Sequence, residues 1–251
     1  MARNSRRIHL AAVYVLHHRP WRDTSRMLDV FSREYGRLTL FARGVRGSKS
    51  QSASLLQPFQ PLVVSWIGGG DTAQLTHVEA APGLSGCTVP LPPAALLSAW
   101  YLNELLLKLT ERGDPQSAVF DLYHLTLDQL RCGAVIAPVL RAFERHLLEL
   151  IGYAVQFSQE ARHGEPLKVE AHYHFHPNLG FVEISGTQPT EGFSGRSLLA
   201  IAADNLMTPE ALEDARKIMR IAIDHALEGR ELRTRVVARA ITRAASTRAA
   251  S

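Results

Sequence analysis

The sequence contains only two cysteines, Cys87 and Cys132, among its 251 residues. Two thiols cannot build a disulfide framework or a four-thiolate zinc site, so neither kind of stabilisation is expected. We interpret both residues as small buried hydrophobic side chains of a protein in a reducing compartment.

Long hydrophobic runs are also missing. The longest apolar stretch, residues 96–109, is interrupted by polar and charged residues and falls short of the roughly 18 apolar residues that a spanning helix needs. The N-terminal segment MARNSRRIHLAAVYVLHHRP has basic residues before an apolar patch, but the patch is short and no small-residue cleavage site follows it. The sequence therefore predicts a cytoplasmic protein without a membrane segment.

Common catalytic motifs are absent as well. The chain has no G-x-S-x-G, no H-E-x-x-H and no Cys-His arrangement above background, so we expect a protein that is not an enzyme. His172, His174 and His176 alternate and would share one face of a strand, as metal ligands must. No cysteine or carboxylate at ligand spacing completes a coordination shell, and we expect no metal and no cofactor.

Positive charge gathers in the first third of the chain. Residues 1–80 carry 11 Lys and Arg against 5 Asp and Glu, whereas residues 81–170 carry 7 against 10. A locally basic domain indicates a polyanionic partner.

The segment GVRGSKS within this basic third resembles a nucleotide phosphate loop. Its two glycines, Gly44 and Gly47, are separated by two residues where four are needed, and Lys49 does not directly follow a glycine. The spacing therefore excludes a phosphate loop and leaves a loop that is suited to the phosphates of a polymer.

Alternating apolar residues predict five short strands before residue 80, namely residues 8–16, 25–32, 36–42, 61–67 and 73–79. Five strands in so short a segment suggest an oligonucleotide-binding (OB) barrel. A linker rich in proline follows. Beyond it the apolar residues recur at helical spacing, and three helices are expected at residues 93–112, 115–131 and 138–152.

The rest of the chain is expected to contain both strands and helices. Two strands joined by a turn are predicted near residues 170–187, and Ser194 and Thr208 are expected to cap later helices. A last amphipathic helix is expected at residues 231–241 and a frayed tail at 243–251. The fold class is thus α+β, with an OB-fold domain at 1–80 and a helical domain with a small zinc-free β-hairpin at 81–251.

Cations and aromatic residues are mixed along the predicted barrel, as binding of single-stranded nucleic acid requires. The aromatics include Trp21, Phe31, Tyr35, Phe41 and Trp66. An equally weighted alternative is that most of these rings fill the barrel and that the charges are a solvated face. The candidate DNA-binding residues are Arg19, Arg22, Arg33, Arg37, Phe41, Arg43, Arg46 and Lys49.

Several segments agree in order with one known family. RPWRDTSRMLDVFSREYGRLTLFARGVRGSKS, LLQPFQPL, WYLNELLLKL, LRAFERHLLELIGY, GFSGRSLLAI and EGRELRTRVV together resemble the bacterial DNA repair protein RecO family, over nearly the whole chain. The resemblance implies a recombination mediator that binds single- and double-stranded DNA and anneals complementary strands. It also implies that the protein acts with RecR to load RecA onto DNA covered by single-strand-binding protein.

The same resemblance implies a site in the helical part for the acidic C-terminal tail of single-strand-binding protein. The candidate residues are Arg141, Phe143, Arg196 and Arg220. Some family members carry a four-cysteine zinc module at the position where this chain has HYHFHPNLGFVEISG. This segment contains no cysteine, so zinc is not expected here. The competing hypotheses are a metal-dependent enzyme that acts on nucleic acid and a tail-binding scaffold that binds no DNA.

Overall fold

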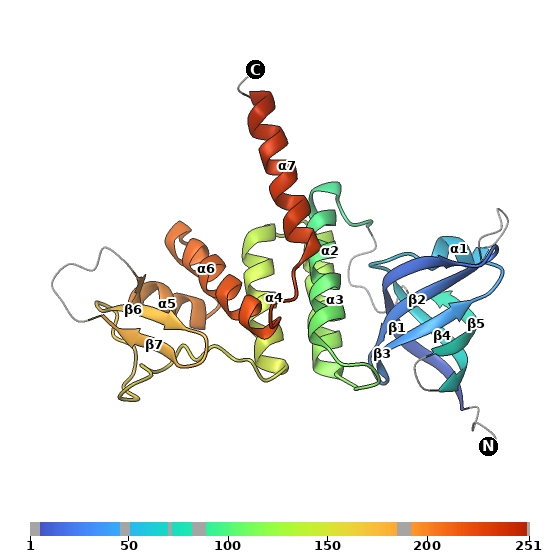
Figure 1. The fold of residues 1–251 in the computed structure, drawn as a ribbon, viewed down its shortest axis with the longest axis horizontal. Helices are drawn as coiled ribbons and strands as arrows, with labels where there is room; N and C mark the ends of the chain where they lie inside the picture. The colour runs from blue at the N-terminus through green and yellow to red at the C-terminus, as the bar shows by residue number, and fades with distance from the viewer. Residues whose placement is uncertain (1–5, 46–50, 70–71, 82–88, 185–191, 250–251) are drawn as a thin grey trace. The chain divides into compact units, whose positions relative to one another are not determined.

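The structure is a computed structural model that describes residues 6–45, 51–69, 72–81, 89–184 and 192–249 (Figure 1). The chain divides into two compact units. Unit 1 comprises Met1–Ala134 and Leu232–Ser251, and unit 2 comprises Val135–Glu231. Unit 1 thus contains the barrel together with helices from both sides of unit 2 in the sequence, and the expected domain division at residue 80 stays a prediction.

The elements of unit 1 are β1 (Arg7–Trp21), β2 (Ser25–Ser32), β3 (Gly36–Ala42), α1 (Gln51–Leu55), β4 (Pro61–Gly69), β5 (Thr72–Ala80), α2 (Pro93–Leu109), α3 (Ser117–Arg131) and α7 (Arg233–Ala249). The elements of unit 2 are α4 (Ile136–Leu150), β6 (His172–His176), β7 (Gly180–Glu183), β8 (Phe193–Ser194), α5 (Gly195–Ala202) and α6 (Pro209–Ala226).

The five predicted strands of the barrel are confirmed. They follow one another around the barrel in the order β1-β2-β3-β5-β4, and β1 pairs with both β2 and β4. The pairing of β3 with β5 is parallel and short, with Leu40 opposite Ala73 and Phe41 opposite Gln74. The barrel interior is filled by small and branched apolar side chains such as Val13, Val30 and Leu40.

A β-bulge in β1 decides which side chains leave the barrel. Val15 faces the core, and the register against β2 shifts between Val15 and His17. One extra residue in a strand moves every later side chain to the opposite face. His17, Arg19 and Trp21 therefore lie on the side of β1–β3 that points away from the interior, which we call the outer face.

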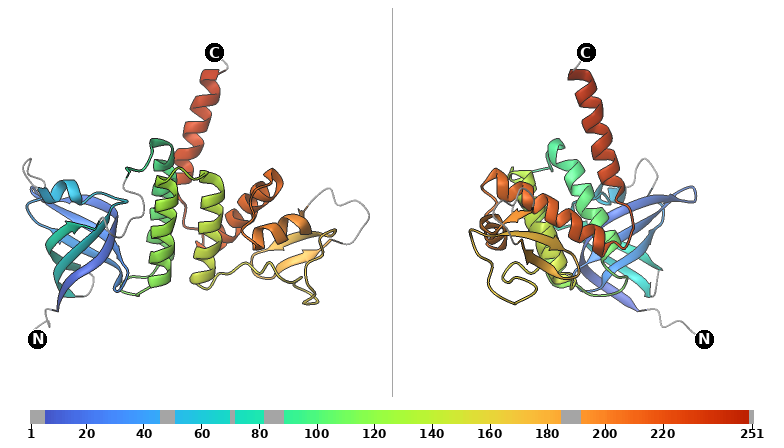
Figure 2. Two further views of the ribbon diagram at one scale, coloured as in Figure 1. Left: turned by 180° about the vertical axis from the view of Figure 1, so that it is seen from behind. Right: turned by 60° about the vertical axis from the view of Figure 1, so that its left-hand side comes forward.

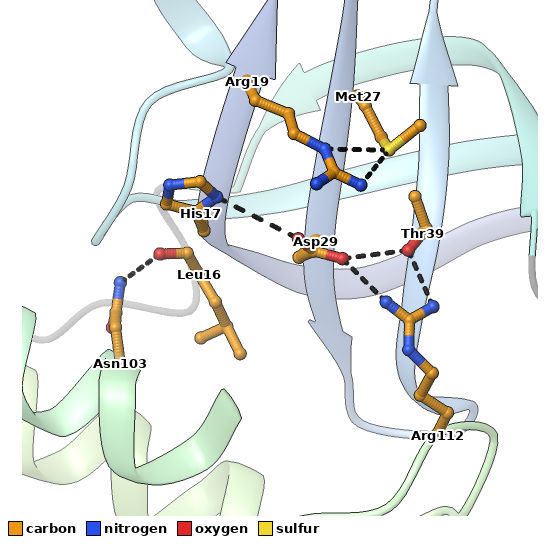
Figure 3. Close-up of polar contacts among 8 residues, drawn as sticks. All are labelled: Leu16, His17, Arg19, Met27, Asp29, Thr39, Asn103 and Arg112. Carbon is orange, nitrogen blue, oxygen red and sulfur yellow. Dashed lines mark hydrogen bonds and ion pairs between the residues drawn. The ribbon is translucent and has the colours of Figure 1, made fainter. Parts of the chain in front are cut away.

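The part of the outer face around Tyr14 and Phe31 is covered by α3. Both side chains are buried, and the ring of Tyr14 lies 5.4 Å from that of Phe120 and 5.0 Å from that of Tyr123, between centroids. The amide of Asn103 in α2 donates to the carbonyl of Leu16 at the bulge, over 2.8 Å (Figure 3). The helices of unit 1 thus cover one end of the outer face and leave the other end open.

Gly36 allows the turn between β2 and β3 to approach the loop between α2 and α3. Its φ is +64°, and a Cβ atom at this position would lie 2.0 Å from the carbonyl oxygen of Asp114. A glycine is therefore required both for the backbone conformation and for the close approach.

Unit 2 packs α6 against α4 and α5 and adds a small sheet, seen from two further directions in Figure 2. The predicted caps are confirmed, since the hydroxyls of Ser194 and Thr208 accept from the backbone N–H groups of Ser197 and Ala211. In place of the expected two-stranded hairpin, the structure has a sheet of three strands in the order β7-β6-β8. The third strand, Phe193–Ser194, pairs with β6 but is not joined to it by a short turn, so no turn motif in the sequence indicates the pairing.

The last helix and the cysteines differ from what the sequence predicts. The frayed tail expected at residues 243–251 was wrong as far as Ala249, because α7 continues to that residue. Five of the seven residues from Arg243 to Ala249 are Ala or Arg with high helix propensity, which supports the continuation. Cys87 lies outside the described residues, and Cys132 is exposed rather than buried.

Candidate nucleic-acid interface

The turn between β1 and β2 borders an open depression of about 730 Å³ on the barrel. The end of β3 and the start of β5 form its other sides, because Phe41 and Gln74 are opposite each other in the β3–β5 pairing. The lining residues are Trp21, Arg22, Asp23, Thr24, Ser25, Phe41, Arg43 and Gln74. We call this site the aromatic depression.

Two aromatic rings meet in the aromatic depression. Trp21 ends β1 and is 41% exposed, and Phe41 of β3 is half-buried. Their ring centroids are 5.6 Å apart and the ring planes meet at 60°, an edge-on arrangement. Because part of the indole remains accessible, it can stack on a nucleobase, and such stacking contributes about 1–3 kcal/mol per base.

Arg19 lies on the same face as these rings. It is opposite Met27, which in turn is opposite Phe41 in the next strand. The Nε and Nη2 atoms of Arg19 lie 3.2 and 2.9 Å from the sulfur of Met27 (Figure 3). The side chain is thus held across the sheet, with its charge beside the aromatic depression.

Two further cations line the depression itself. Arg22 and Arg43 are both exposed, and Asp23 is the acidic residue of the lining. Arg22 adopts φ +51° in the turn, a left-handed conformation that costs a residue with a side chain about 1–2 kcal/mol.

Asp29 lies next on the outer face, and its charge is compensated (Figure 3). One carboxylate oxygen accepts from the hydroxyl of Thr39 at 2.9 Å and from Nη2 of Arg112 at 3.0 Å. Arg112 also donates to the Thr39 hydroxyl at 2.8 Å, and His17 lies 4.0 Å from the second carboxylate oxygen. A carboxylate that would repel phosphates is therefore covered by a guanidinium from the loop between α2 and α3.

Arg33 and Arg37 lie at the other end of β2 and β3, where the helices of unit 1 cover the barrel. Arg33 makes two hydrogen bonds of 2.8 Å to the carboxylate of Asp121 in α3, and these lower the pKa of Asp121. Arg37 is half-buried and donates to the carbonyl of Thr110 at 2.8 Å; burial lowers the pKa of its guanidinium. Both side chains bridge barrel and helices, and their contact with DNA stays a prediction.

The structure thus brings together Arg22, Phe41 and Arg43 of the predicted DNA-binding residues, with Arg19 beside them. Arg46 and Lys49 lie outside the described residues. Sequence reasoning named Trp21 among the aromatic residues of the barrel but not among the candidate DNA-binding residues, and it did not name Gln74. Trp21 could have been found from its period-two spacing to Arg19, whereas the position of Gln74 depends on the parallel β3–β5 pairing, which leaves no local signal.

The predicted tail-binding residues of unit 2 have different surroundings. Phe143 is 1% exposed and lies in the core, so a ligand would reach it only if the surrounding side chains moved. Arg141 is largely buried and pairs with Glu144 at 2.8 Å. Arg196 and Arg220 are exposed and lie 3.4 Å from Glu170 and 3.9 Å from Asp224, respectively. Their role in peptide binding stays a prediction.

The alternating histidines do share one side of β6, where His174 and His176 are exposed. Within the part of the chain that the structure describes, no group of three or more His, Cys, Asp or Glu residues is placed to hold a metal ion. Across the same residues, no helix is both long and apolar enough to cross a membrane.

Comparison with known proteins gives matches along most of the chain. The family model described as Recombination protein O N terminal matches residues 7–83, and the one described as Recombination protein O C terminal matches residues 93–235. The DNA repair protein RecO of Cupriavidus metallidurans is 37% identical over 94% of this chain and 78% of its own length. The DNA repair protein RecO of Methylococcus capsulatus is 38% identical over 91% and 92%, respectively.

Proposed function

This chain belongs to the RecO family of DNA repair proteins, and from that premise we propose that it binds single-stranded DNA at the open end of the outer face. The observation that carries the proposal is the aromatic depression, which is lined by the rings of Trp21 and Phe41 together with Arg22 and Arg43. Stacking rings beside cations suit a strand whose bases are unpaired, because every base offers a π face and every nucleotide a phosphate.

The proposed role is that of a non-enzymatic recombination mediator. It would bind single- and double-stranded DNA, anneal complementary strands, and act with RecR to load RecA onto strands covered by single-strand-binding protein. What supports a binding role rather than catalysis is the chemistry of the depression, since its lining is two arginines, two aromatic rings and neutral polar groups around one carboxylate. Acid/base or nucleophilic catalysis needs paired groups of a kind that this lining does not supply.

A second contact, with the acidic tail of single-strand-binding protein, is proposed for unit 2. Arg196 and Arg220 support it, because both side chains are exposed, and their ion pairs with Glu170 at 3.4 Å and Asp224 at 3.9 Å lie at a solvated surface, where such pairs are weak. A fluorescent peptide with acidic and aromatic residues at its C-terminus should bind the wild type more tightly than Arg196→Ala/Arg220→Ala; equal binding would remove these two residues from the proposal.

The DNA proposal is tested by truncating the rings. Trp21→Ala and Phe41→Ala should each weaken binding of a short single-stranded oligonucleotide by about 5- to 150-fold, the equivalent of about 1–3 kcal/mol of stacking. Fluorescence anisotropy measures the affinity, and circular dichroism establishes that each variant is folded.

The matched control is Tyr153→Ala, which removes a ring of similar exposure, 42%, from unit 2. It should leave oligonucleotide binding unchanged. Full affinity in both barrel variants would place the single strand elsewhere and contradict the proposal.

A further inference from the structure

The last helix of the chain, α7, carries an unusual charge pattern. Residues 233–249 contain five arginines and no acidic residue. Arg235, Arg239 and Arg243 are four residues apart, so they lie along one side of the helix at steps of about 6 Å. We call these three residues the arginine stripe.

The start of α7 is fixed to α2. The carboxylate of Glu104 accepts hydrogen bonds from the backbone N–H groups of Arg233 and Thr234, at 2.8 and 2.9 Å, and from the Thr234 hydroxyl at 2.7 Å. Leu232 is buried just before the helix, and the guanidinium of Arg235 lies 5.9 Å from the centre of the Tyr101 ring. The stripe therefore begins at a position that unit 1 determines.

The rest of α7 extends beyond this attachment. Residues 239–244 are all exposed, and Ile241 is 56% exposed. In Figures 1 and 2 this part of the helix runs past the end of α2 with no other described element of unit 1 alongside. Helices in proteins gain most of their stability from packing, and like charges four residues apart are destabilising. A polyanion along the stripe would remove the repulsion.

We propose that α7 is a second nucleic-acid-binding element, in which the arginine stripe contacts the phosphates of a strand. The proposal rests on the proposed function in one respect, because it takes DNA as the polyanion. Guanidinium groups suit phosphates well, since they remain charged and donate two parallel hydrogen bonds.

A membrane surface is the other polyanion that a basic helix can meet. Helices that lie in a bilayer interface carry bulky anchors such as Trp, Phe or Leu on the apolar side. The apolar residues of α7 are Val236, Val237, Ile241 and alanines, which offer little area for insertion. The pattern therefore favours nucleic acid.

Two phosphate-binding surfaces on one unit would have a consequence for annealing. The aromatic depression would hold one strand by its bases and phosphates, whereas the stripe would hold a further segment, or a second strand, by phosphates alone. Strands held together on one molecule meet at a raised effective concentration, and pairing then proceeds faster.

The test compares Arg239→Ala/Arg243→Ala with Arg239→Lys/Arg243→Lys in the full chain. An oligonucleotide of about 8 nucleotides fits one OB barrel and should bind the Ala variant as it binds the wild type. A strand of about 40 nucleotides should bind the Ala variant about tenfold more weakly, and its log–log salt slope should become shallower by about 1.4, because two contacts are lost. The Lys variant should keep most of the affinity, and annealing of complementary strands should slow only in the Ala variant.

Unchanged affinity and salt slope for the long strand in the Ala variant would overturn the inference. So would a loss of binding to vesicles containing phosphatidylserine with no loss of binding to DNA, since α7 would then be a membrane element. If Trp21→Ala leaves short-strand binding intact while Arg239→Ala/Arg243→Ala weakens long-strand binding, the proposal for the barrel fails and the inference on α7 stands.

Discussion

Asp29 places a carboxylate in the middle of the outer face, between the aromatic depression and the part covered by α3. Its partners are Arg112 and Thr39, which hold one oxygen at 3.0 and 2.9 Å. The Asp29 side chain is only 16% exposed and that of Arg112 is 41% exposed, so solvent screens this pair less than it screens a fully exposed one. The pair also affects a bound polyanion, because a phosphate that passes over the outer face meets a neutral pair in place of a negative charge.

This interpretation of Asp29 and Arg112 predicts that the effects of replacing the two residues on DNA affinity are not additive. Arg112→Ala should weaken binding of single-stranded DNA by about fivefold, the equivalent of about 1 kcal/mol, because it exposes the Asp29 charge. Asp29→Asn should bind at least as tightly as the wild type. The double variant should return to within about twofold of the wild type, as measured by fluorescence anisotropy at low salt.

If the double variant is as weak as Arg112→Ala, then Arg112 contacts phosphate directly and does not act through Asp29. Thermal melts of all three variants control for loss of structure, because Arg112 also donates to Thr39.

At the scale of elements, the first turn of α7 is capped by one side chain of α2. The first N–H groups of a helix have no partner within it, and here the Glu104 carboxylate supplies the acceptor. Burial by itself would raise the pKa of Glu104, but the hydrogen bonds from Thr234 and Arg233 outweigh it, and the pKa lies below its usual value. An ionised Glu104 therefore stabilises the folded protein.

Because the pKa of Glu104 is lowered in the folded protein, the stability that it contributes depends on pH. The stabilisation is present above the unfolded-state pKa of about 4.3 and is lost as the pH falls through the lower folded-state pKa. Glu104→Gln should therefore lower the free energy of unfolding by about 1 kcal/mol at pH 7, as removal of a helix cap does. The difference from the wild type should shrink below about pH 4.

Urea denaturation at both pH values measures this difference. Glu111→Gln, which removes an exposed carboxylate two residues after the end of α2, is the matched control and should have little effect at either pH. A deficit of Glu104→Gln that is the same at both pH values would show that packing, and not charge, is lost.

For the whole molecule, the charge of unit 1 decides how binding responds to salt. The first 80 residues carry an excess of cations, and α7 adds five arginines without an acid. Each phosphate contact with a single strand contributes about −0.7 to the slope of log affinity against log salt. Long-range attraction of this kind raises the rate of association as well.

Salt titration of a short single strand should separate the roles of the predicted arginines. Arg22→Ala/Arg43→Ala should make the slope shallower by about 1.4, because both side chains line the aromatic depression. Arg33→Ala should change the slope less, because its guanidinium already holds the Asp121 carboxylate by two hydrogen bonds. Equal changes in the two variants would mean that the strand continues from the depression to the covered end of the barrel.

Much of the architecture could be predicted from local pattern. The five strands of the barrel and the helix caps at Ser194 and Thr208 depend on residues that are close in sequence. β8 was missed because a strand of two residues carries no periodicity, and its pairing partner β6 is far away along the chain. The extent of α7 does not follow from periodicity, because residues 243–249 contain no large apolar side chain that would mark a buried face.

The candidate site also contains residues that the local pattern predicts and residues whose role it cannot distinguish. Arg22, Phe41 and Arg43 were predicted from composition, since cations and rings in a basic third of the chain already indicate a polyanion. Arg33 and Arg37 belong to the same pattern, yet they lie against α2 and α3. Composition cannot separate these two groups, because the contacts that distinguish them join residues more than 70 positions apart.

By itself, the sequence determined the strands, most of the helices, the family and the sign of the charge, because periodicity, capping and composition are local properties. Only the tertiary structure decided which side chains face outward together. The bulge after Val15 turns Arg19 and Trp21 out of the barrel, the parallel β3–β5 pairing brings Gln74 to Phe41, and Arg112 arrives from between two helices to cover Asp29. These positions depend on register and on packing between distant segments, which the local pattern does not encode.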